Sequence, residues 1–293
     1  MSFVVDNAVI MAAGTSSRFA PLSYERPKAL IEVKGEILIE RQIRQLREAG
    51  VKDVYVVTGY KAECFDYLKE KCGVKLIHNP DYLTRNNNAS IRAAAHVLGN
   101  TYICSADNYF CENPFESEVD DSYYSAVYVS GPTAEWCMEE DKHGYIGRVT
   151  VGGRDSWVML GHTFWNCEFS REFLRILDEE YDLPETAGKL WESIFIEHMD
   201  TLKMKIRHYD SDMIFEFDTL DELRQFDGSY ITDTRSTLLK QAAEQIGAAE
   251  KDIIHIRNVA GNDTAAAGFT FNCGGREYKY MYAEGRIMKN TEE

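Results

Sequence analysis

The chain has 293 residues, 44% of them hydrophobic, which allows one large α/β domain with an appendage or two modest domains. Its formal net charge of −16 argues against a surface for nucleic acid or for anionic membrane, because a negative field repels both. The seven cysteines are scattered without a Cys-x-x-Cys pair, so neither a zinc cage nor a disulfide framework is indicated. With no basic leader and no apolar run near the ~20 residues of a membrane span, we expect a cytoplasmic protein.

A phosphate-binding loop is predicted directly after the first strand. Residues 8–12 form an apolar run that stops before Gly14, a pattern typical of a buried strand that feeds a tight turn. Gly14 tolerates positive φ and lets a ligand approach the backbone, while Thr15 adds a hydroxyl donor. Arg18 and Lys28 then supply positive charge for phosphate oxygens, although an ordinary surface lysine is the alternative for Lys28. Neither a Walker loop nor a dinucleotide fingerprint matches this spacing.

Helices and strands alternate after the loop. Apolar spacing predicts helices over residues 37–50, 62–71 and 90–98, and strands over 54–57, 74–77 and 101–104. This alternation is typical of a parallel sheet, in which ligands bind beyond the carboxyl ends of the strands. Gly14, Gly59 and Ala106 are expected to emerge at that edge.

The second half of the chain has a different texture. Between residues 120 and 165, short apolar runs separated by glycines predict antiparallel strands. Further along, we expect helices over 170–180, 189–199, 219–226 and 235–246, and strands over 213–218, 253–259, 269–272 and 277–282. The expected domains are residues 1–228 and a small α+β appendage, residues 229–293.

Two aspartates at strand ends are the candidate metal ligands. Asp107 follows an apolar strand at the expected ligand edge, and Asp218 ends a strand just before a helix. Carboxylates suit Mg²⁺ that bridges phosphate oxygens. The alternative is that a strand-end aspartate caps the next turn or helix. We favour the metal role for Asp107, whereas capping competes evenly at Asp218.

The loop resembles the signature of sugar-phosphate nucleotidyltransferases, and the resemblance widens along the chain to the bacterial CTP:phosphocholine and 2-aminoethylphosphonate cytidylyltransferases. It extends over residues 6–227. The segments that carry it are residues 12–30, 40–43, 57–60, 86–90, 106–109, 135–136 and 215–218. The resemblance implies a Rossmann-like nucleotidyltransferase with a mostly parallel sheet flanked by helices, and with a small antiparallel subdomain that binds the acceptor.

The same resemblance implies an activity and a site. CTP and a small phospho- or phosphono-amine, either phosphocholine or 2-aminoethylphosphonate, would react, with Mg²⁺ as cofactor, to give the cytidylyl-activated headgroup and pyrophosphate. Arg18 and Lys28 would act on the phosphates, and Asp107 and Asp218 would bind the metal. The nucleotide would contact Ala12, Ala13, Gly14, Thr15, Gly59, Tyr60, Asn86, Asn87, Ser90 and Ala106.

The acceptor amine is expected to meet Trp136 and Glu216. An aromatic face and a carboxylate bind a cation by cation–π and charge attraction, although Trp136 could equally be a core residue. The phosphocholine enzymes have Asp-Leu-Tyr-Trp where this chain has Gly188-Lys189-Leu190-Trp191. A pocket that loses an acid and a tyrosine and gains Lys189 should favour choline less, so 2-aminoethylphosphonate becomes a serious candidate.

The tail weakly resembles the start of a choline-kinase-like N-lobe, yet no kinase catalytic loop follows it. A remnant, a lid and a contact between copies in a homo-oligomer stay open as its role, and we favour a structural one. Two rival functions also stay open for the chain. One is a sugar-1-phosphate nucleotidyltransferase, and the other is a regulatory nucleotide-binding module without catalysis.

Overall fold

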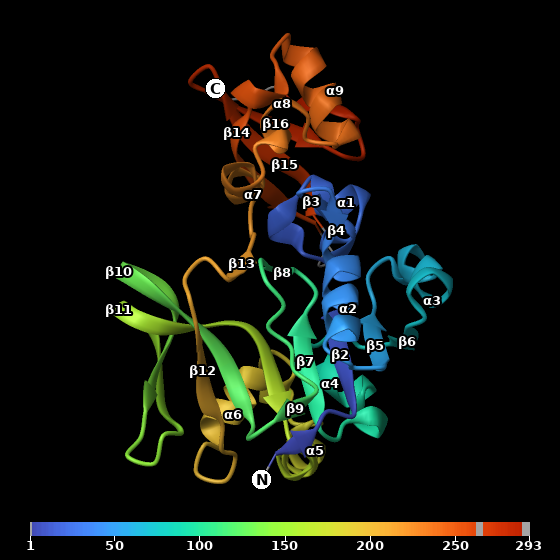
Figure 1. Cartoon of the computed structure of the whole chain (residues 1–293). Helices are drawn as coiled ribbons and strands as arrows, with labels where there is room; N and C mark the ends of the chain where they lie inside the picture. The colour runs from blue at the N-terminus through green and yellow to red at the C-terminus, as the bar shows by residue number, and fades with distance from the viewer. Residues whose placement is uncertain (1, 262–265, 289–293) are drawn as a thin grey trace. The chain divides into compact units, whose positions relative to one another are not determined.

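The computed structural model describes residues 2–261 and 266–288, and the chain forms two compact units (Figure 1). Neither unit is continuous in sequence. The first contains Met1–Gly14 and Leu38–Glu216, and the second contains Thr15–Ile37 and Phe217–Glu293. The expected boundary after residue 228 thus falls inside the second unit, to which the segment following Gly14 also contributes. Appendage 229–293 as a separate domain stays a prediction.

A sheet of seven strands organises the described part of the first unit. Its strand order is β12-β10-β11-β7-β2-β5-β6, with β2, β5, β6 and β7 mutually parallel. The bounds are β2 Asn7–Ala12, β5 Asp53–Thr58, β6 Lys75–His78, β7 Thr101–Ser105, β10 Tyr123–Glu140, β11 Ile146–Trp165 and β12 Lys205–Tyr209. Apolar residues dominate β2, and its central position leaves most of it buried. The predicted parallel core is confirmed.

Helices flank this sheet, and two small strand pairs form separate sheets in the same unit. The helices are α2 Leu38–Glu48, α3 Tyr67–Cys72, α4 Asn88–Ala93, α5 Cys167–Glu180 and α6 Trp191–Glu197, with short 3₁₀ turns η3 Ala62–Phe65, η4 Ala95–Val97 and η5 Pro184–Thr186. β1 Phe3–Val4 pairs with β9 Glu118–Val119, and β8 Asn108–Phe110 pairs with β13 Ile214–Glu216. Gln42 of α2 donates to the carbonyls of Ser105 (2.9 Å) and Asn108 (2.8 Å), which fixes the turn between β7 and β8.

The antiparallel part differs from the prediction of several short strands. Instead, β10 and β11 are two long strands that pair along their length and bend at repeated register shifts (Figure 1). Pro132 pairs with Arg154 inside the ribbon, and Gly153 pairs with Thr133. These residues resemble chain breakers in the sequence, but β-bulges accommodate them. Strand β12, which pairs in parallel with β10, was not predicted.

The core of the first unit is rich in aromatic side chains. Trp165 and Trp191 are 0% and 1% exposed, and their ring centroids lie 5.1 Å apart. Phe173 of α5 packs against both rings. Because Trp191 opens α6, this packing fixes where that helix begins and where the residues next to it lie.

The second unit joins a segment early in the chain to its C-terminal part. Its early elements are η1 Ser17–Phe19, α1 Leu22–Glu25, η2 Lys28–Leu30, β3 Glu32–Val33 and β4 Glu36–Ile37. Its later helices are α7 Leu220–Phe226, α8 Ser229–Thr232 and α9 Thr237–Ile246, with a turn η6 Glu250–Asp252. Glu25 accepts hydrogen bonds from the N–H groups of Thr237 (2.9 Å) and Leu238 (3.0 Å), at the start of α9. Such a carboxylate stabilises a helix N-terminus.

The tail forms an antiparallel sheet in the order β14-β15-β16-β17. Its strands are β14 Ile254–Ala260, β15 Ala266–Cys273, β16 Arg276–Met281 and β17 Arg286–Met288. Within residues 2–261 and 266–288, no helix has the length and apolar character needed to cross a membrane.

Candidate functional site

Three strand ends of the parallel sheet meet at one edge of the first unit. β2 lies between β5 and β7. Beyond these strands, the Tyr60 N–H donates to the carbonyl of Ala13 (3.0 Å), and the Ala106 N–H donates to the carbonyl of Met11 (3.2 Å). The structure therefore gathers most of the first-unit residues predicted to bind the nucleotide: Ala12, Ala13, Gly14, Gly59, Tyr60 and Ala106.

Gly14 leaves open space beside the backbone of the predicted loop. The left-handed residue here is Ser16 (φ 47°), and Gly14 lies outside that region. A Cβ on Gly14 would meet no atom within 4 Å. The space beside this backbone is therefore open to a ligand.

Gly59 is a different case, because a side chain has no room there. A Cβ at this position would lie 2.8 Å from the carbonyl oxygen of Ala13 and 2.6 Å from Cγ of Tyr82. Turning the aromatic ring does not relieve the clash, because Cβ of Tyr82 also lies 2.7 Å away and the carbonyl belongs to the backbone of the loop. Glycine thus lets the ends of β2 and β5 approach closely.

Gly59→Ala is expected to lower the free energy of unfolding by about 1–3 kcal/mol, because the backbone at Ala13 must move to relieve the clash. Chemical denaturation measures this change. Gly14→Ala is the matched control for stability, since its Cβ meets nothing within 4 Å. An unchanged denaturation midpoint in Gly59→Ala would show that the strand ends adapt without cost.

Two cations and a carboxylate meet in the second unit, whose first residue is Thr15. Arg18 Nη1 lies 2.7 Å from Asp218 Oδ2, and Lys28 Nζ lies 3.6 Å from Asp218 Oδ1. Lys28 is 5% exposed and lies over the Phe19 ring, whereas the Arg18 side chain is 73% exposed. The alternative of an ordinary surface lysine is therefore wrong for Lys28. A buried ammonium needs a nearby anion, and Asp218 provides one.

The start of α7 leaves the Asp218 carboxylate available. Thr219 is the N-cap, and its hydroxyl accepts a hydrogen bond from the N–H of Glu222 (3.2 Å). In return, the Glu222 carboxylate accepts from the N–H groups of Asp218 (2.7 Å) and Thr219 (3.1 Å), which completes a capping box. The structure thus assigns the capping role to Thr219, and the alternative that Asp218 caps this helix is wrong.

Carboxylates gather near the hydroxyl of Tyr124 in the first unit. Glu216 of β13 is in register with Asn108, the residue that follows Asp107. Burial raises the pKa of Tyr124 well above its ordinary value, and the negative charges of Glu192, Glu216 and Asp107 raise it further. A cation would be attracted to this region.

Trp136 lies on the ribbon formed by β10 and β11. It is in register with Val151, which is 74% exposed. Trp136 itself is half-buried rather than part of the core, so the alternative of a plain core tryptophan is wrong. Its role toward the acceptor stays a prediction.

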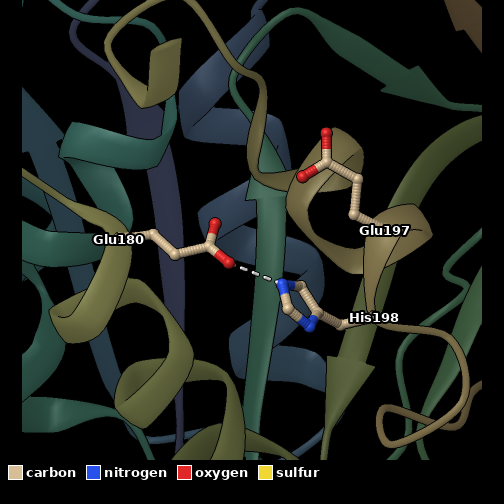
Figure 2. A group of neighbouring side chains, drawn as sticks. All are labelled: Glu180, Glu197 and His198. Atoms are coloured by element: carbon tan, nitrogen blue, oxygen red, sulfur yellow. Dashed lines mark hydrogen bonds and ion pairs between the residues drawn. The ribbon is translucent and has the colours of Figure 1, made fainter. Parts of the chain in front are cut away.

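Lys189 contacts a cluster of Glu180, Glu197 and His198 at the ends of α5 and α6, and Figure 2 shows the three cluster residues. Its Nζ lies 2.6 Å from Glu197 Oε2 and 3.9 Å from Glu180 Oε2, and Glu180 Oε1 lies 2.7 Å from His198 Nε2. The hydrogen bond to Glu197 raises the pKa of Lys189. Glu180, Glu197 and His198 are residue types that bind metals, but the ammonium already supplies positive charge here. The contact of Lys189 with the acceptor stays a prediction. In the structure, Glu197 and Glu180 already compensate the charge of Lys189.

Three consecutive asparagines bind the segment that leads into α6. Asn86 Nδ2 donates to the carbonyl of Gly188 (3.1 Å), and Asn88 Nδ2 donates to that of Thr186 (2.9 Å). The Asn87 Oδ1 accepts from the N–H of Trp191 (2.7 Å). These amides therefore hold residues 186–191 against the start of α4, and the assignment of Asn86 and Asn87 to cytidine stays a prediction.

Ser90, the other predicted cytidine contact, is 4% exposed and connects to the sheet. Its hydroxyl accepts from Asn79 Nδ2 (3.2 Å), and the Asn79 N–H donates to the carbonyl of Thr58 at the end of β5 (2.8 Å). Asn79 thus links the Ser90 hydroxyl to the end of β5, at the predicted nucleotide edge.

Glu192, which was not predicted as a site residue, completes this network. Asn87 Nδ2 donates to Glu192 Oε2 (3.0 Å), and the Tyr124 hydroxyl donates to Glu192 Oε1 (3.4 Å). Burial raises the pKa of the Glu192 carboxyl to about 7. The available signal was an acidic residue directly after Trp191, in the first turn of an amphipathic helix, but this pattern is also typical of a solvated helix start.

The raised pKa of Glu192 predicts a pH-dependent stability. Between the ordinary value of 4.5 and about 7, the folded state keeps a proton that the unfolded state has released. Stability from this group is therefore complete below pH 4.5 and is lost as the pH rises toward 7. Relative to Glu192→Gln, wild type should lose up to about 3 kcal/mol of unfolding free energy across this window. Denaturant titrations of both proteins at the two ends measure it, and a constant difference would contradict the shift.

Comparison with known proteins agrees with this geometry. Residues 8–115 match the MobA-like NTP transferase domain. The chain is 36% identical over 234 residues to a 2-aminoethylphosphonate cytidylyltransferase of Lancefieldella rimae, a match that covers 78% of this chain and 95% of the relative. It is 31% identical over 220 residues to a choline-phosphate cytidylyltransferase of Streptococcus pneumoniae, covering 75% and 96%.

A solved structure extends the similarity to three dimensions. The CTP:phosphocholine cytidylyltransferase from Streptococcus pneumoniae matches with a TM-score of 0.74 and 31% identity, over 78% of this chain and 99% of that chain. The predicted nucleotidyltransferase fold, with its mostly parallel sheet flanked by helices, is confirmed. The chain is a nucleotidyltransferase and belongs to the family of choline-phosphate and 2-aminoethylphosphonate cytidylyltransferases.

Proposed function

We propose that the enzyme transfers the cytidylyl group of CTP to a small phospho- or phosphono-amine, and that it prefers 2-aminoethylphosphonate to phosphocholine. An anionic oxygen of the acceptor attacks the α-phosphorus of CTP. A new P–O bond forms there as the bond to the bridging oxygen of the β-phosphate breaks, and pyrophosphate leaves. The attacking oxygen is already ionised near neutral pH, so catalysis consists of positioning and charge neutralisation.

The residues described above support this reaction. Arg18 and Lys28 place two positive charges where a polyphosphate needs compensation, and Lys28 is already buried. The backbone beside Gly14 is open to the nucleotide, and Gly59 lets the neighbouring strand ends approach closely. These groups hold the reactants and stabilise the charge that develops on the leaving pyrophosphate.

Nucleotidyltransferases of this family generally use a divalent metal, and we propose Mg²⁺ here. Asp107 and Asp218 are the proposed ligands, and their carboxylate oxygens are the donors that Mg²⁺ prefers. Asp218 fits this role because its carboxylate does not cap the helix and already pairs with the cations of Arg18 and Lys28. When bound, the metal would compensate phosphate charge.

The preference for 2-aminoethylphosphonate rests on the carboxylates near Tyr124. A primary ammonium has N–H donors that carboxylates accept, whereas a trimethylammonium has none and is bound mainly by aromatic faces. The charges of Glu192, Glu216 and Asp107 all raise the pKa of Tyr124, and the Glu192 carboxylate, 3.4 Å from the Tyr124 hydroxyl, is an acceptor of the kind a primary ammonium needs. The 36% identity to a 2-aminoethylphosphonate cytidylyltransferase adds support. Trp136 is proposed to cover the amine.

Pyrophosphate release tests the proposal directly. The purified full chain is assayed with CTP and Mg²⁺ against 2-aminoethylphosphonate, phosphocholine and glucose 1-phosphate. The expected order of kcat/KM is 2-aminoethylphosphonate, then phosphocholine, with glucose 1-phosphate inactive. Turnover with only the sugar phosphate would overturn the function, and a higher kcat/KM for phosphocholine would overturn the preference.

The remaining aspects of the function stay proposals as well. With a net charge of −16, we propose that neither nucleic acid nor membrane is a partner. The C-terminal appendage is proposed as a structural element and as the contact of a homo-oligomer, and the enzyme is proposed to act in the cytoplasm.

A further inference from the structure

Both polar atoms of the Asn87 side-chain amide form hydrogen bonds with the segment that contains Glu192. Its oxygen accepts from the Trp191 N–H at 2.7 Å, and its nitrogen donates to Glu192 Oε2 at 3.0 Å. The second Glu192 oxygen faces the Tyr124 hydroxyl at 3.4 Å. One asparagine therefore fixes both the start of α6 and the orientation of the carboxylate one residue later.

The surroundings of this pair indicate what the carboxylate recognises. Tyr124, 8% exposed, is influenced by the charges of Glu192, Glu216 and Asp107. A carboxylate held in a desolvated position is unfavourable unless a cation arrives. The ammonium of the acceptor is such a cation, while the cytosine base carries no positive charge.

We infer that Asn87 is a positioning residue for the acceptor: it holds Glu192 so that this carboxylate binds the acceptor's ammonium group. The inference rests on the proposed function and deepens it. It also moves Asn87 from the nucleotide, where the family resemblance places it, to the recognition of the second substrate. Its effect should therefore fall on the KM for the acceptor and leave the KM for CTP nearly unchanged.

The first test compares two acceptors that differ only in the amine. Glu192→Gln keeps the size of the side chain and removes its charge. With 2-aminoethylphosphonate, its KM should rise about 10- to 100-fold, as expected for a charged hydrogen bond lost from a desolvated site. With ethylphosphonate, which lacks the amine, the variant and wild type should be alike. An equal penalty with both acceptors would assign Glu192 a structural role and overturn the inference.

The second test addresses Asn87 itself. Asn87→Asp keeps the oxygen that accepts from Trp191 but replaces the donor to Glu192 by a second carboxylate, so the KM for 2-aminoethylphosphonate should rise about tenfold or more. In Asn87→Asp/Glu192→Gln the donor and acceptor are exchanged, and a carboxylate returns on the opposite partner. This double variant should recover part of the lost affinity.

The controls separate this inference from the proposed function. Glu179→Gln removes one charge from an exposed pair with Arg175 on α5 and should match wild type in both KM values. Thermal unfolding verifies that every variant is folded. A rise in the KM for CTP in Asn87→Asp, with the acceptor KM unchanged, would overturn the inference and restore the nucleotide role. Absence of turnover in wild type with every amine would instead overturn the proposed function.

Discussion

Lys28→Ala is expected to lower kcat/KM for CTP by about 10²- to 10³-fold, the loss typical of removing one preorganised group that stabilises transition-state charge. Lys28 is 5% exposed, and its ammonium lies 3.6 Å from the Asp218 carboxylate. Such a buried charge costs no reorganisation when the pyrophosphate leaves. Exposed Arg18 cannot replace it fully, because water screens its charge.

Steady-state kinetics with varied CTP measures this effect. Lys240→Ala is the matched control in the same unit, because its ammonium pairs with Asp233 on the surface, 2.8 Å away. Lys28→Arg keeps the charge but changes its shape, and should recover only part of the loss. Unfolding midpoints must accompany the rates, since Lys28→Ala leaves Asp218 with one cation fewer. A well-folded Lys28→Ala within threefold of wild type would refute the role.

Asp107→Asn is expected to lower kcat by about 10³-fold, because an amide is a poor Mg²⁺ ligand and carries no charge to hold the metal. Asp107 lies in the two-residue turn between β7 and β8, so the two strand ends position it. The half-saturating Mg²⁺ concentration should also rise, since fewer anionic ligands remain.

Two measurements distinguish a metal role from misfolding. CTP binding by calorimetry without divalent metal should be nearly equal in Asp107→Asn and wild type, whereas the gain on adding Mg²⁺ should shrink in the variant. Asp120→Asn removes an exposed aspartate of the same unit and serves as control. An identical Mg²⁺ dependence in Asp107→Asn and wild type would show that the metal binds elsewhere.

Local patterns predicted the parallel half of the fold well. Strands β2, β5, β6 and β7 each have a short apolar run, and helices separate them, so the period of each segment was sufficient. The ribbon of β10 and β11 was misjudged because Pro132, Gly152 and Gly153 resemble turn residues. The tight turn instead contains Gly144 (φ 79°), where the Asp141 N–H donates to the Tyr145 carbonyl. Bulges are set by the partner strand, which a single segment does not reveal.

Candidate site residues divide in the same way. Gly14 and Gly59 could be predicted to lie at the strand-end edge because each closely follows a short apolar run. Glu192 was missed because its value depends on burial, and burial depends on Asn87 and Tyr124, which are distant in sequence. An acid after a tryptophan reads as a surface residue until those neighbours are known.

The family and the class of reaction could be predicted from the residues alone, because short contiguous segments carry that chemistry. How distant charges pair depends on the tertiary fold. The fold pairs Lys28 with Asp218 and Lys189 with Glu197, and it brings Asn87 within hydrogen-bond distance of Glu192. These pairings follow from packing between segments up to 190 residues apart, as for Lys28 and Asp218. Residue type fixes what a side chain can do, but the fold fixes which partner it meets.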